Sequence, residues 1–291
     1  MARLRDLVEL TRAPAALSVP GDAVAGAAAA GTLGPRTAGL AAASVCLYWA
    51  GMAANDWSDR ALDARERPER PIPSGRVTPG QALGLAAGLT GAGVALAALT
   101  GGPRALRVAL PLAAAVWTYD LALKNTPAGP AGMAACRGLD VLLGASPGRV
   151  RRAIRPAAVV AAHTYLVTAL SQHEVHGAPP ELAAATLAGT AAVAAAATVP
   201  MPTGSRVPGV ARFGVASAIA GWYASRFGRA QKAVLDKPAA GNVRAAVGAG
   251  ITSLPALQGA LTAAAGHPVV GAAVAAAYPA ARTLAKRVSP T

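Results

Sequence analysis

The sequence predicts an all-α fold, a polytopic bundle of transmembrane helices. Hydrophobic residues make up 54% of the chain, charged residues only 14%, and the mean hydropathy is +0.41, whereas a soluble domain carries about 25% charged residues. The apolar stretches are too long and too rich in alanine for strands, and no alternating barrel pattern occurs. We therefore expect a single domain over residues 1–291, with nine or ten spans around a central cavity that opens to the cytosol.

Apolar segments of about 20 residues, the length that crosses a bilayer, follow one another along the whole chain. The abundant alanine and the 32 glycines favour close packing of these helices. No soluble domain of useful size remains between them. In a nine-span alternative, residues 243–284 form one span and an interfacial piece. The expected spans are 15–33, 37–54, 79–100, 103–122, 128–146, 153–171, 180–199, 207–225, 243–264 and 267–284.

The formal net charge of +14 indicates contact with anionic lipid headgroups. Nucleic-acid binding is disfavoured, because the basic residues are scattered between apolar spans. With a cytosolic N-terminus, the cytosolic segments hold 17 Lys and Arg residues and the opposite segments hold 9. This bias, and the lack of a signal-peptide cleavage pattern, predict a multi-pass protein of the cell membrane with its N-terminus and polar loops in the cytosol. The arginines at 149–155 oppose this orientation locally.

One polar island, residues 55–76, interrupts the apolar first half of the chain. Asn55, Asp59 and Asp63 are spaced i, i+4, i+8, so a helical backbone places them on one face, and Asp56 lies beside them. Carboxylates at this spacing repel one another unless they share a cation. Hard oxygen ligands suit Mg²⁺, which binds one or two carboxylates together with substrate phosphates. The arginines that follow suit a polyanion, so the island predicts a diphosphate site.

Two other interpretations of the island are weaker. A solvated turn that balances nearby arginines needs no such regular spacing of carboxylates. A CDP-alcohol phosphotransferase also uses Mg²⁺ in the membrane, but its motif needs Asp-Gly before the Ala-Arg pair and a later Gly-x-x-x-Asp. Ala64-Arg65 is present here without either flank.

The motifs of the chain resemble those of the UbiA superfamily of membrane prenyltransferases. Asn55-Asp56-x-x-Asp59-x-x-x-Asp63, followed by the segment 67–76 (RPERPIPSGR), is similar to the first Asp-rich motif of that superfamily. Segment 119–127 (YDLALKNTP) resembles its Tyr…Lys turn after the fourth span. Segment 10–14 (LTRAP) resembles the start of its first span, and Arg137-Gly138-Leu139 resembles part of its fifth.

The resemblance implies transfer of an isoprenyl group from a Mg²⁺-bound isoprenyl diphosphate to an aromatic or other electron-rich acceptor. Ionisation of the donor gives an allylic carbocation and releases diphosphate. The negative charge that develops on the diphosphate must be met by cations in a poorly hydrated site. By the resemblance, Asn55, Asp56, Asp59 and Asp63 hold the metal. The other implied contacts to the substrate are Arg65, Arg70, Tyr119, Asp120, Lys124 and Arg137.

The second Asp-rich motif of the superfamily is reduced in this chain. Its position after the sixth span reads 171–177 (SQHEVHG), with Glu174 as the one carboxylate. We expect Glu174 to act as a catalytic metal ligand in its place. The reduced loop and the extra residue between Tyr119 and Lys124 resemble a divergent bacterial branch, the UbiA-like proteins of ebo-type gene clusters. The reduction also admits an alternative function, a non-catalytic or transport-coupled protein that binds an isoprenoid or lipid diphosphate.

Two candidate residues have alternative roles. Arg137 lies inside a predicted span, where a charge costs about 2.5–3.5 kcal/mol on insertion scales. It either forms an ion pair with Asp140 or contacts the diphosphate deep in the pocket. Asp120 either helps to hold the metal or caps the turn that follows the fourth span.

Overall fold

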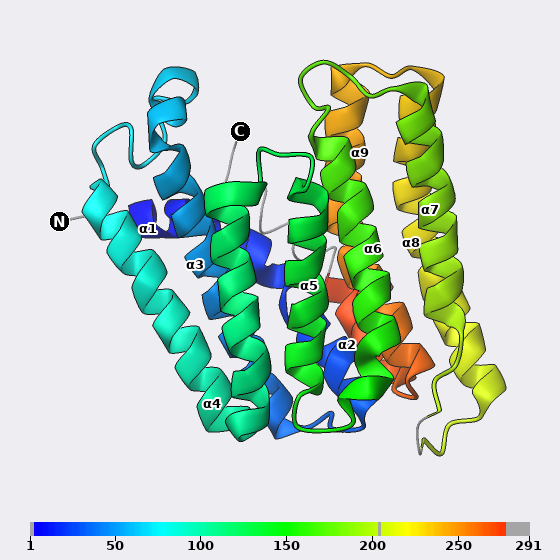
Figure 1. Cartoon of the computed structure of the whole chain (residues 1–291). Coiled ribbons are helices and arrows are strands. Elements are labelled where there is room, and N and C mark those ends of the chain that lie inside the picture. Colours follow the sequence, from blue (N-terminus) through cyan, green and yellow to red (C-terminus); the bar gives the residue numbers. More distant parts are fainter. Residues whose placement is uncertain (1–2, 203–204, 278–291) are drawn as a thin grey trace.

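The structure is a computed structural model that describes residues 3–202 and 205–277. Within these ranges every regular element is helical, which confirms the predicted fold class (Figure 1). The short elements are the 3-10 helices η1 (Ala13–Ser18) and η3 (Val150–Ala153) and the π-helical turn η2 (Tyr119–Leu123). The labelled α-helices are α1 (Leu4–Leu10), α2 (Pro20–Ala30), α3 (Pro35–Glu66), α4 (Pro79–Thr118), α5 (Gly129–Ala145), α6 (Ile154–Ser171), α7 (Pro180–Thr198), α8 (Gly209–Asp236) and α9 (Ala240–Ala264). A further short apolar helix, Pro268–Ala277, follows α9.

The helices coincide in position with the predicted spans. Within the described residues, four are long and apolar enough to cross a membrane: Pro35–Glu66, Pro79–Leu123, Val150–Ser171 and Pro180–Thr198. The predicted first span, 15–33, is interrupted, since η1 ends at Ser18 and α2 begins at Pro20, whose ring fixes φ and provides no N–H. The end of the predicted span 267–284 lies outside the described residues.

Helix α4 contains two predicted spans, 79–100 and 103–122. Gly102 has φ +67° and ψ −158°, and Pro103 follows it. Glycine adopts this positive φ without a steric penalty, whereas other residues seldom do. The chain reverses its direction there, so the second half of α4 runs back beside α5 (Figure 1).

Helix α3 is longer than the predicted span 37–54. It continues as a regular helix to Glu66, so the Asp-rich motif lies on its last turns rather than in a loop. The charged side chains of these turns form ion pairs with other segments, as described below. Because the backbone is helical, the spacing of the carboxylates determines which of them share a face.

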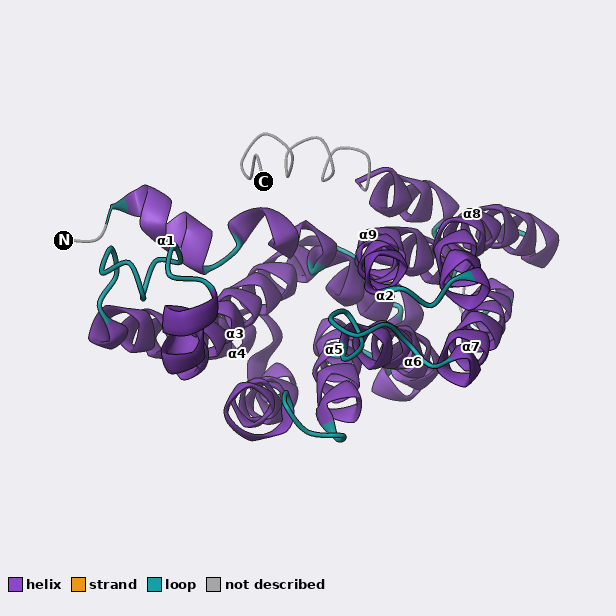
Figure 2. Ribbon diagram, turned by 90° about the horizontal axis from the view of Figure 1, so that it is seen from above, coloured by secondary structure: helices purple, strands orange, loops and turns teal. Residues whose placement is uncertain are grey.

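Helices α2 and α5 connect the two halves of the bundle. Seen from above, α3 and α4 lie at one side and α7 and α8 at the other (Figure 2). A Cβ added to Gly26 of α2 would lie 1.9 Å from the Val141 carbonyl oxygen, and one added to Gly144 of α5 would lie 2.2 Å from that of Ala23. The two backbones therefore touch directly, which is how small residues pack membrane helices in the absence of a hydrophobic driving force.

This backbone contact yields a stability prediction. Gly144→Ala places a methyl group against the α2 backbone, and overpacking of this kind costs about 1–3 kcal/mol. We expect a lower thermal midpoint in detergent. The matched control is Gly221→Ala on α8, where a Cβ meets nothing within 4 Å, and whose midpoint should not fall. Equal midpoints for both variants would show that the helix contact has room to relax.

Candidate active site

The polar candidates lie at one end of the bundle, the upper end in Figure 1. The end of α3, helix α1 and the connections after α4, α6 and α8 all meet there. The loop after α6 is tied to its neighbours: Gln172 Nε2 donates to the Thr126 carbonyl at 3.0 Å, and Arg244 Nη1 donates to the Glu174 carbonyl at 2.8 Å. Segments that are far apart in the sequence thus form one polar surface.

The first group of this surface joins Asp56 and Asp63, which are buried two turns apart on α3. Arg70 Nη1 lies 2.7 Å from Asp63 Oδ2 and 3.4 Å from Asp56 Oδ1. Arg12 Nη2 donates to Asp56 Oδ1 at 3.1 Å. Guanidinium groups from two other segments therefore compensate two buried carboxylates. A buried charge needs such a hydrogen-bonded partner, because it has lost its hydration.

The second group joins the side of α3 that faces η2. Lys124 Nζ lies 2.7 Å from Asp59 Oδ1 and donates to Ser58 Oγ at 2.6 Å. Asn55 Nδ2 donates to Asp120 Oδ1 at 3.1 Å. Asp120 is buried, and its Oδ2 has no hydrogen-bond partner among the residues that the structure describes. The predicted pair of Asn55 and Asp59 is present here, but Asp63 belongs to the first group.

The donor set fits Mg²⁺ in its chemistry. Among the described residues, no three His, Cys, Asp or Glu side chains form a metal-binding group. However, Mg²⁺ bound with a diphosphate takes only one or two protein carboxylates and fills the remaining positions with phosphate oxygens and water. Asp59 and the unpartnered Oδ2 of Asp120 provide hard oxygens beside Lys124 and Asn55.

Arg76 fastens α1 over this end of the bundle. Its Nη1 lies 2.8 Å from Asp6 Oδ1 and 2.7 Å from Glu9 Oε2, and its Nη2 donates to the Glu69 carbonyl at 2.7 Å. The hydrogen bonds from Arg76 lower the pKa of both acids. Directly after α1, Arg12 adopts a left-handed backbone with φ +46°, uncommon for a residue other than glycine, and its side chain reaches Asp56.

An apolar cavity of about 90 Å³ adjoins the second group. Asp120 belongs to both, since it lines the cavity and accepts the hydrogen bond from Asn55. A Cβ at Gly51 would lie 3.4 Å from Asp120 Oδ2, so this glycine leaves room around the free oxygen. The cavity is lined by α3, α4, η2, α5 and the residue before α2, mainly through Val19, Leu47, Tyr48, Met52, Leu112, Val116, Tyr119, Met133 and Cys136.

Arg137 lies at the wall of this cavity, and its ion-pair partner differs from the expected Asp140. Its Nη2 lies 2.9 Å from Asp22 Oδ2 of α2. Asp140 instead accepts a hydrogen bond from Ser44 Oγ. The reason is the direct contact of α2 with α5, which brings Asp22 to Arg137 from another helix. Asp120 Oδ1 accepts its hydrogen bond from Asn55 Nδ2, so the contact of this side chain joins η2 to α3.

Two predicted site residues, Arg65 and Glu174, lie outside both groups of ion pairs. Arg65 is exposed and makes no side-chain hydrogen bond or ion pair within the described part of the chain. Glu174 is half-buried. Burial raises its pKa, although the positive charges of Arg244 and Arg67 lower it. Glu174 forms no metal-binding group with the acids of α3 in this structure.

Four residues of the site were not among the sequence candidates. Arg12 and Ser58 contact Asp56 and Lys124, and Asp22 and Ser44 lie beside Arg137 and Asp140. Each pairing joins different segments of the chain; Arg12 and Asp56, for example, are 44 positions apart. Asp22 alone carried a signal, since an acid inside an apolar segment requires a partner.

Several known proteins are similar to this chain in sequence. The UbiA prenyltransferase family matches residues 19–287. Digeranylgeranylglyceryl phosphate synthase of Ignicoccus hospitalis is 36% identical over 128 residues, 43% of this chain and 41% of that protein. Its namesake from Methanopyrus kandleri is 39% identical over 133 residues, 43% of this chain and 46% of that protein. The chain thus spans less than half the length of these curated relatives in the matches.

Two solved structures share the fold. The apo structure of a UbiA homolog from Aeropyrum pernix superposes with a TM-score of 0.64 at 21% identity, over 84% of this chain and 96% of that one. A structure from work on the biosynthesis of digeranylgeranylglyceryl phosphate synthase in membranes gives a TM-score of 0.63 at 16% identity, over 91% and 99%. The chain therefore has the multi-pass helical membrane fold of these proteins.

The Arg76 contacts predict how the attachment of α1 depends on pH. Because the folded-state pKa values of Asp6 and Glu9 lie below the ordinary 3.8 and 4.5, the attachment is complete above those values and weakens as the pH falls through the lowered ones. The protection factors of the α1 amides, which correct for the intrinsic pH dependence of exchange, should fall in that acidic window and not above it. Arg76→Gln should lower them already at neutral pH. Fast α1 exchange in the unmodified protein at neutral pH would contradict the attachment.

Proposed function

The chain belongs to the UbiA prenyltransferase family, and from this we propose that it moves an isoprenyl group from an isoprenyl diphosphate to an electron-rich acceptor within the membrane. The observation that supports this most is the position of Asp120. It joins a polar cage of carboxylates and cations to an apolar cavity. A prenyl diphosphate has the same division, a highly charged head on an apolar tail.

Mg²⁺ is the cofactor that the cage suits. Asn55, Asp59 and Asp120 would hold one ion, with Asp56 and Asp63 nearby, and Glu174 is the candidate for the other side of the diphosphate. Bound Mg²⁺ neutralises charge that develops on the leaving group. We propose that the diphosphate oxygens take over cations that now pair with α3, namely Arg70 and Lys124, with Arg12 beside them. Arg65 remains a candidate from the exposed rim.

The reaction follows from this placement. The bond between the allylic carbon and the bridging oxygen breaks, and its electron pair leaves with the diphosphate toward Arg70 and Lys124. The allylic cation remains beside the aromatic faces of Tyr48 and Tyr119, which stabilise positive charge through their ring quadrupoles. An electron-rich atom of the acceptor then forms the new bond and gives up a proton. The apolar wall keeps water, a competing nucleophile, from the cation.

The observations constrain the prenyl acceptor less than the diphosphate donor. The curated relatives are named for a glyceryl phosphate that bears two geranylgeranyl groups, so a hydroxyl group on a prenylated glyceryl phosphate is one electron-rich acceptor to test beside aromatic ones. The reduced loop 171–177 supports instead a place in the branch of ebo-type gene clusters. We place the polar end in the cytosol, on the basis of the Lys and Arg distribution.

A second candidate function rests on Glu174. This half-buried side chain forms no metal-binding group with the acids of α3. The second candidate is therefore a protein that binds or transports an isoprenoid or lipid diphosphate without turning it over. Membranes that contain the protein, Mg²⁺ and labelled prenyl diphosphates of different length separate the two functions. Release of diphosphate supports the enzyme, and tight binding without release supports the binder.

The Asp-rich turns should be required for Mg²⁺-dependent binding of the donor. Asp59→Asn or Asp63→Asn removes a charge but no volume, so the fold should persist while binding of a prenyl diphosphate in the presence of Mg²⁺ is lost. Glu66→Gln, an exposed acid at the end of the same helix, is the control and should bind normally. Normal affinity in both Asp variants, measured by calorimetry in detergent, would exclude the metal role.

Glu174 should affect turnover more than binding. Glu174→Gln keeps size and hydrogen bonding but removes the charge, and we expect turnover at least about tenfold lower, equivalent to about 1.4 kcal/mol of barrier, with a smaller change in donor affinity. Glu181→Gln, an exposed acid at the start of α7, serves as the control. Equal turnover in the two variants would show that the second motif takes no part in catalysis.

A further inference from the structure

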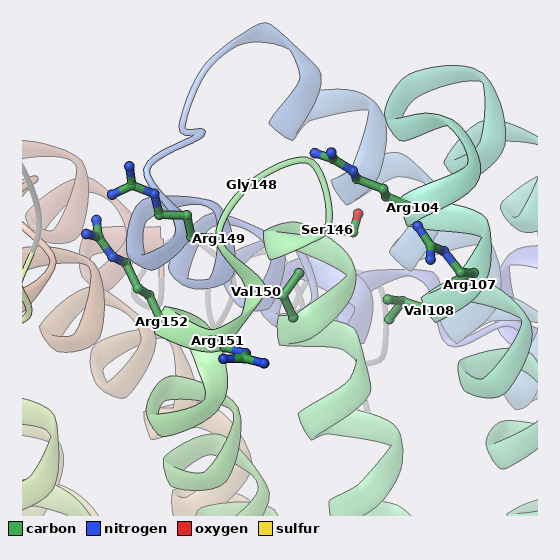
Figure 3. Close-up of a pocket in the computed structure, with 9 residues that line it drawn as sticks. All are labelled: Arg104, Arg107, Val108, Ser146, Gly148, Arg149, Val150, Arg151 and Arg152. Carbon is green, nitrogen blue, oxygen red and sulfur yellow. The ribbon is translucent and has the colours of Figure 1, made fainter.

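A second charged site lies at the opposite end of the bundle from the Asp-rich turns. A hollow of about 670 Å³ opens between the second half of α4 and the connection from α5 to α6. Arg104 and Arg107 come from α4 on one side, and Arg149, Arg151 and Arg152 from the connection on the other (Figure 3). Val108, Ser146, Gly148 and Val150 complete its wall.

The five arginines of this hollow have no acidic partner. No ion pair or side-chain hydrogen bond involves any of them within residues 3–202 and 205–277. The remaining residues of the chain contain no Asp or Glu. By contrast, Arg12, Arg70, Arg76 and Arg137 all pair with carboxylates.

The charge of this whole end is one-sided. It bears nine arginines, at 36, 104, 107, 149, 151, 152, 155, 206 and 212, on the helix ends and connections, while the 13 acidic residues of the chain lie elsewhere. Like charges that line one hollow repel each other. Such an arrangement is stabilised when an anion binds among them, and a guanidinium group grips phosphate oxygens with two parallel hydrogen bonds.

Close backbone contacts hold the two walls of the hollow in place. A Cβ at Gly148 would lie 2.8 Å from the Ala30 carbonyl oxygen, so the connection after α5 rests directly on the end of α2. Arg149 N donates to that same carbonyl at 3.3 Å. On the other side, the turn at Gly102 reverses α4, and a Cβ at Gly101 would lie 3.6 Å from Ser146 Oγ. The arginines therefore project from rigid segments.

We propose that this hollow binds the phosphate headgroup of an anionic membrane phospholipid, in the leaflet opposite the Asp-rich turns. The hollow lies at the ends of membrane-spanning helices, where headgroups lie. Leu110 and Ile154 lie two residues along the chain from the lining residues Val108 and Arg152, and they are 52% and 58% exposed, so the helices next to the hollow carry apolar surface for acyl chains. Basic pockets between transmembrane helices bind anionic headgroups in this way. A soluble anion would make no use of the apolar flank.

The test compares lipids bound to the full-length protein in detergent by native mass spectrometry. Phosphatidylglycerol and phosphatidylcholine are added at equal concentration. The unmodified protein should retain phosphatidylglycerol preferentially, and Arg107→Gln with Arg151→Gln should weaken that retention by about tenfold. The matched control, Arg36→Gln with Arg206→Gln, removes the same charge from the same end outside the hollow and should retain the lipid.

Three outcomes would overturn the proposal. They are equal retention of the two lipids by the unmodified protein, equal loss in both double variants, and displacement of phosphatidylglycerol by excess inorganic phosphate, which would indicate an anion site without a lipid. Arg107→Lys with Arg151→Lys keeps the charge and is a second variant in case the Gln pair unfolds; it should bind more weakly than the unmodified protein. None of these residues belongs to the proposed prenyl diphosphate site, so donor binding should persist in every variant.

Discussion

The compensation of the α3 carboxylates is the constraint on which the polar end of this protein depends. Asp56, Asp59 and Asp63 lie within two turns of one helix, and Asp56 and Asp63 are buried. Each is neutralised by a cation from elsewhere in the chain, so the ends of several segments must meet at α3. A buried carboxylate that lost its partner would destabilise the structure strongly. Arg12, which follows α1, reaches Asp56, and Arg76 fastens α1 across this end through Asp6 and Glu9.

This compensation also bears on ligand binding. A diphosphate with Mg²⁺ brings both signs of charge, so it can replace the internal ion pairs without leaving a charge unpaired. The metal would take the place of the protein cations at the carboxylates. The phosphate oxygens would take the place of the carboxylates at the protein cations. In the proposed function, binding would exchange one set of pairs for another.

The sequence was sufficient for the fold class and for the Asp-rich motif, because both depend on local patterns. Helical segments follow from composition and length, and the reversal at Gly102 falls between two predicted spans. Local patterns do not show which residues from distant segments form the ion pairs. The expected pair of Arg137 and Asp140 is one turn apart, yet the helix crossing at Gly26 and Gly144 brings Asp22 to Arg137 instead.

The extent of helix also depends on tertiary contacts. Hydropathy ends the second span near residue 54, where the charges begin. The structure continues α3 to Glu66, because ion pairs to Arg70 and Lys124 stabilise turns that hydropathy does not favour. Tertiary contacts also explain why Asp59 and Asp63 belong to different groups, since Lys124 and Arg70 reach them from different sides of the helix. Spacing gives the face of a helix but not what lies opposite.

The shortness of α2 has a consequence for how the protein is made. Its 11 residues reach about 16 Å at 1.5 Å per residue, roughly half of the hydrocarbon core. The carbonyl of Ser18 before it is paired by Gln258 Nε2 at 2.8 Å and by Arg137 Nη2 at 3.4 Å. Those side chains belong to α5 and α9, which the ribosome delivers much later. The Ser18 carbonyl, in a segment that enters the bilayer early, therefore gains these two partners only after α5 and α9 have been made.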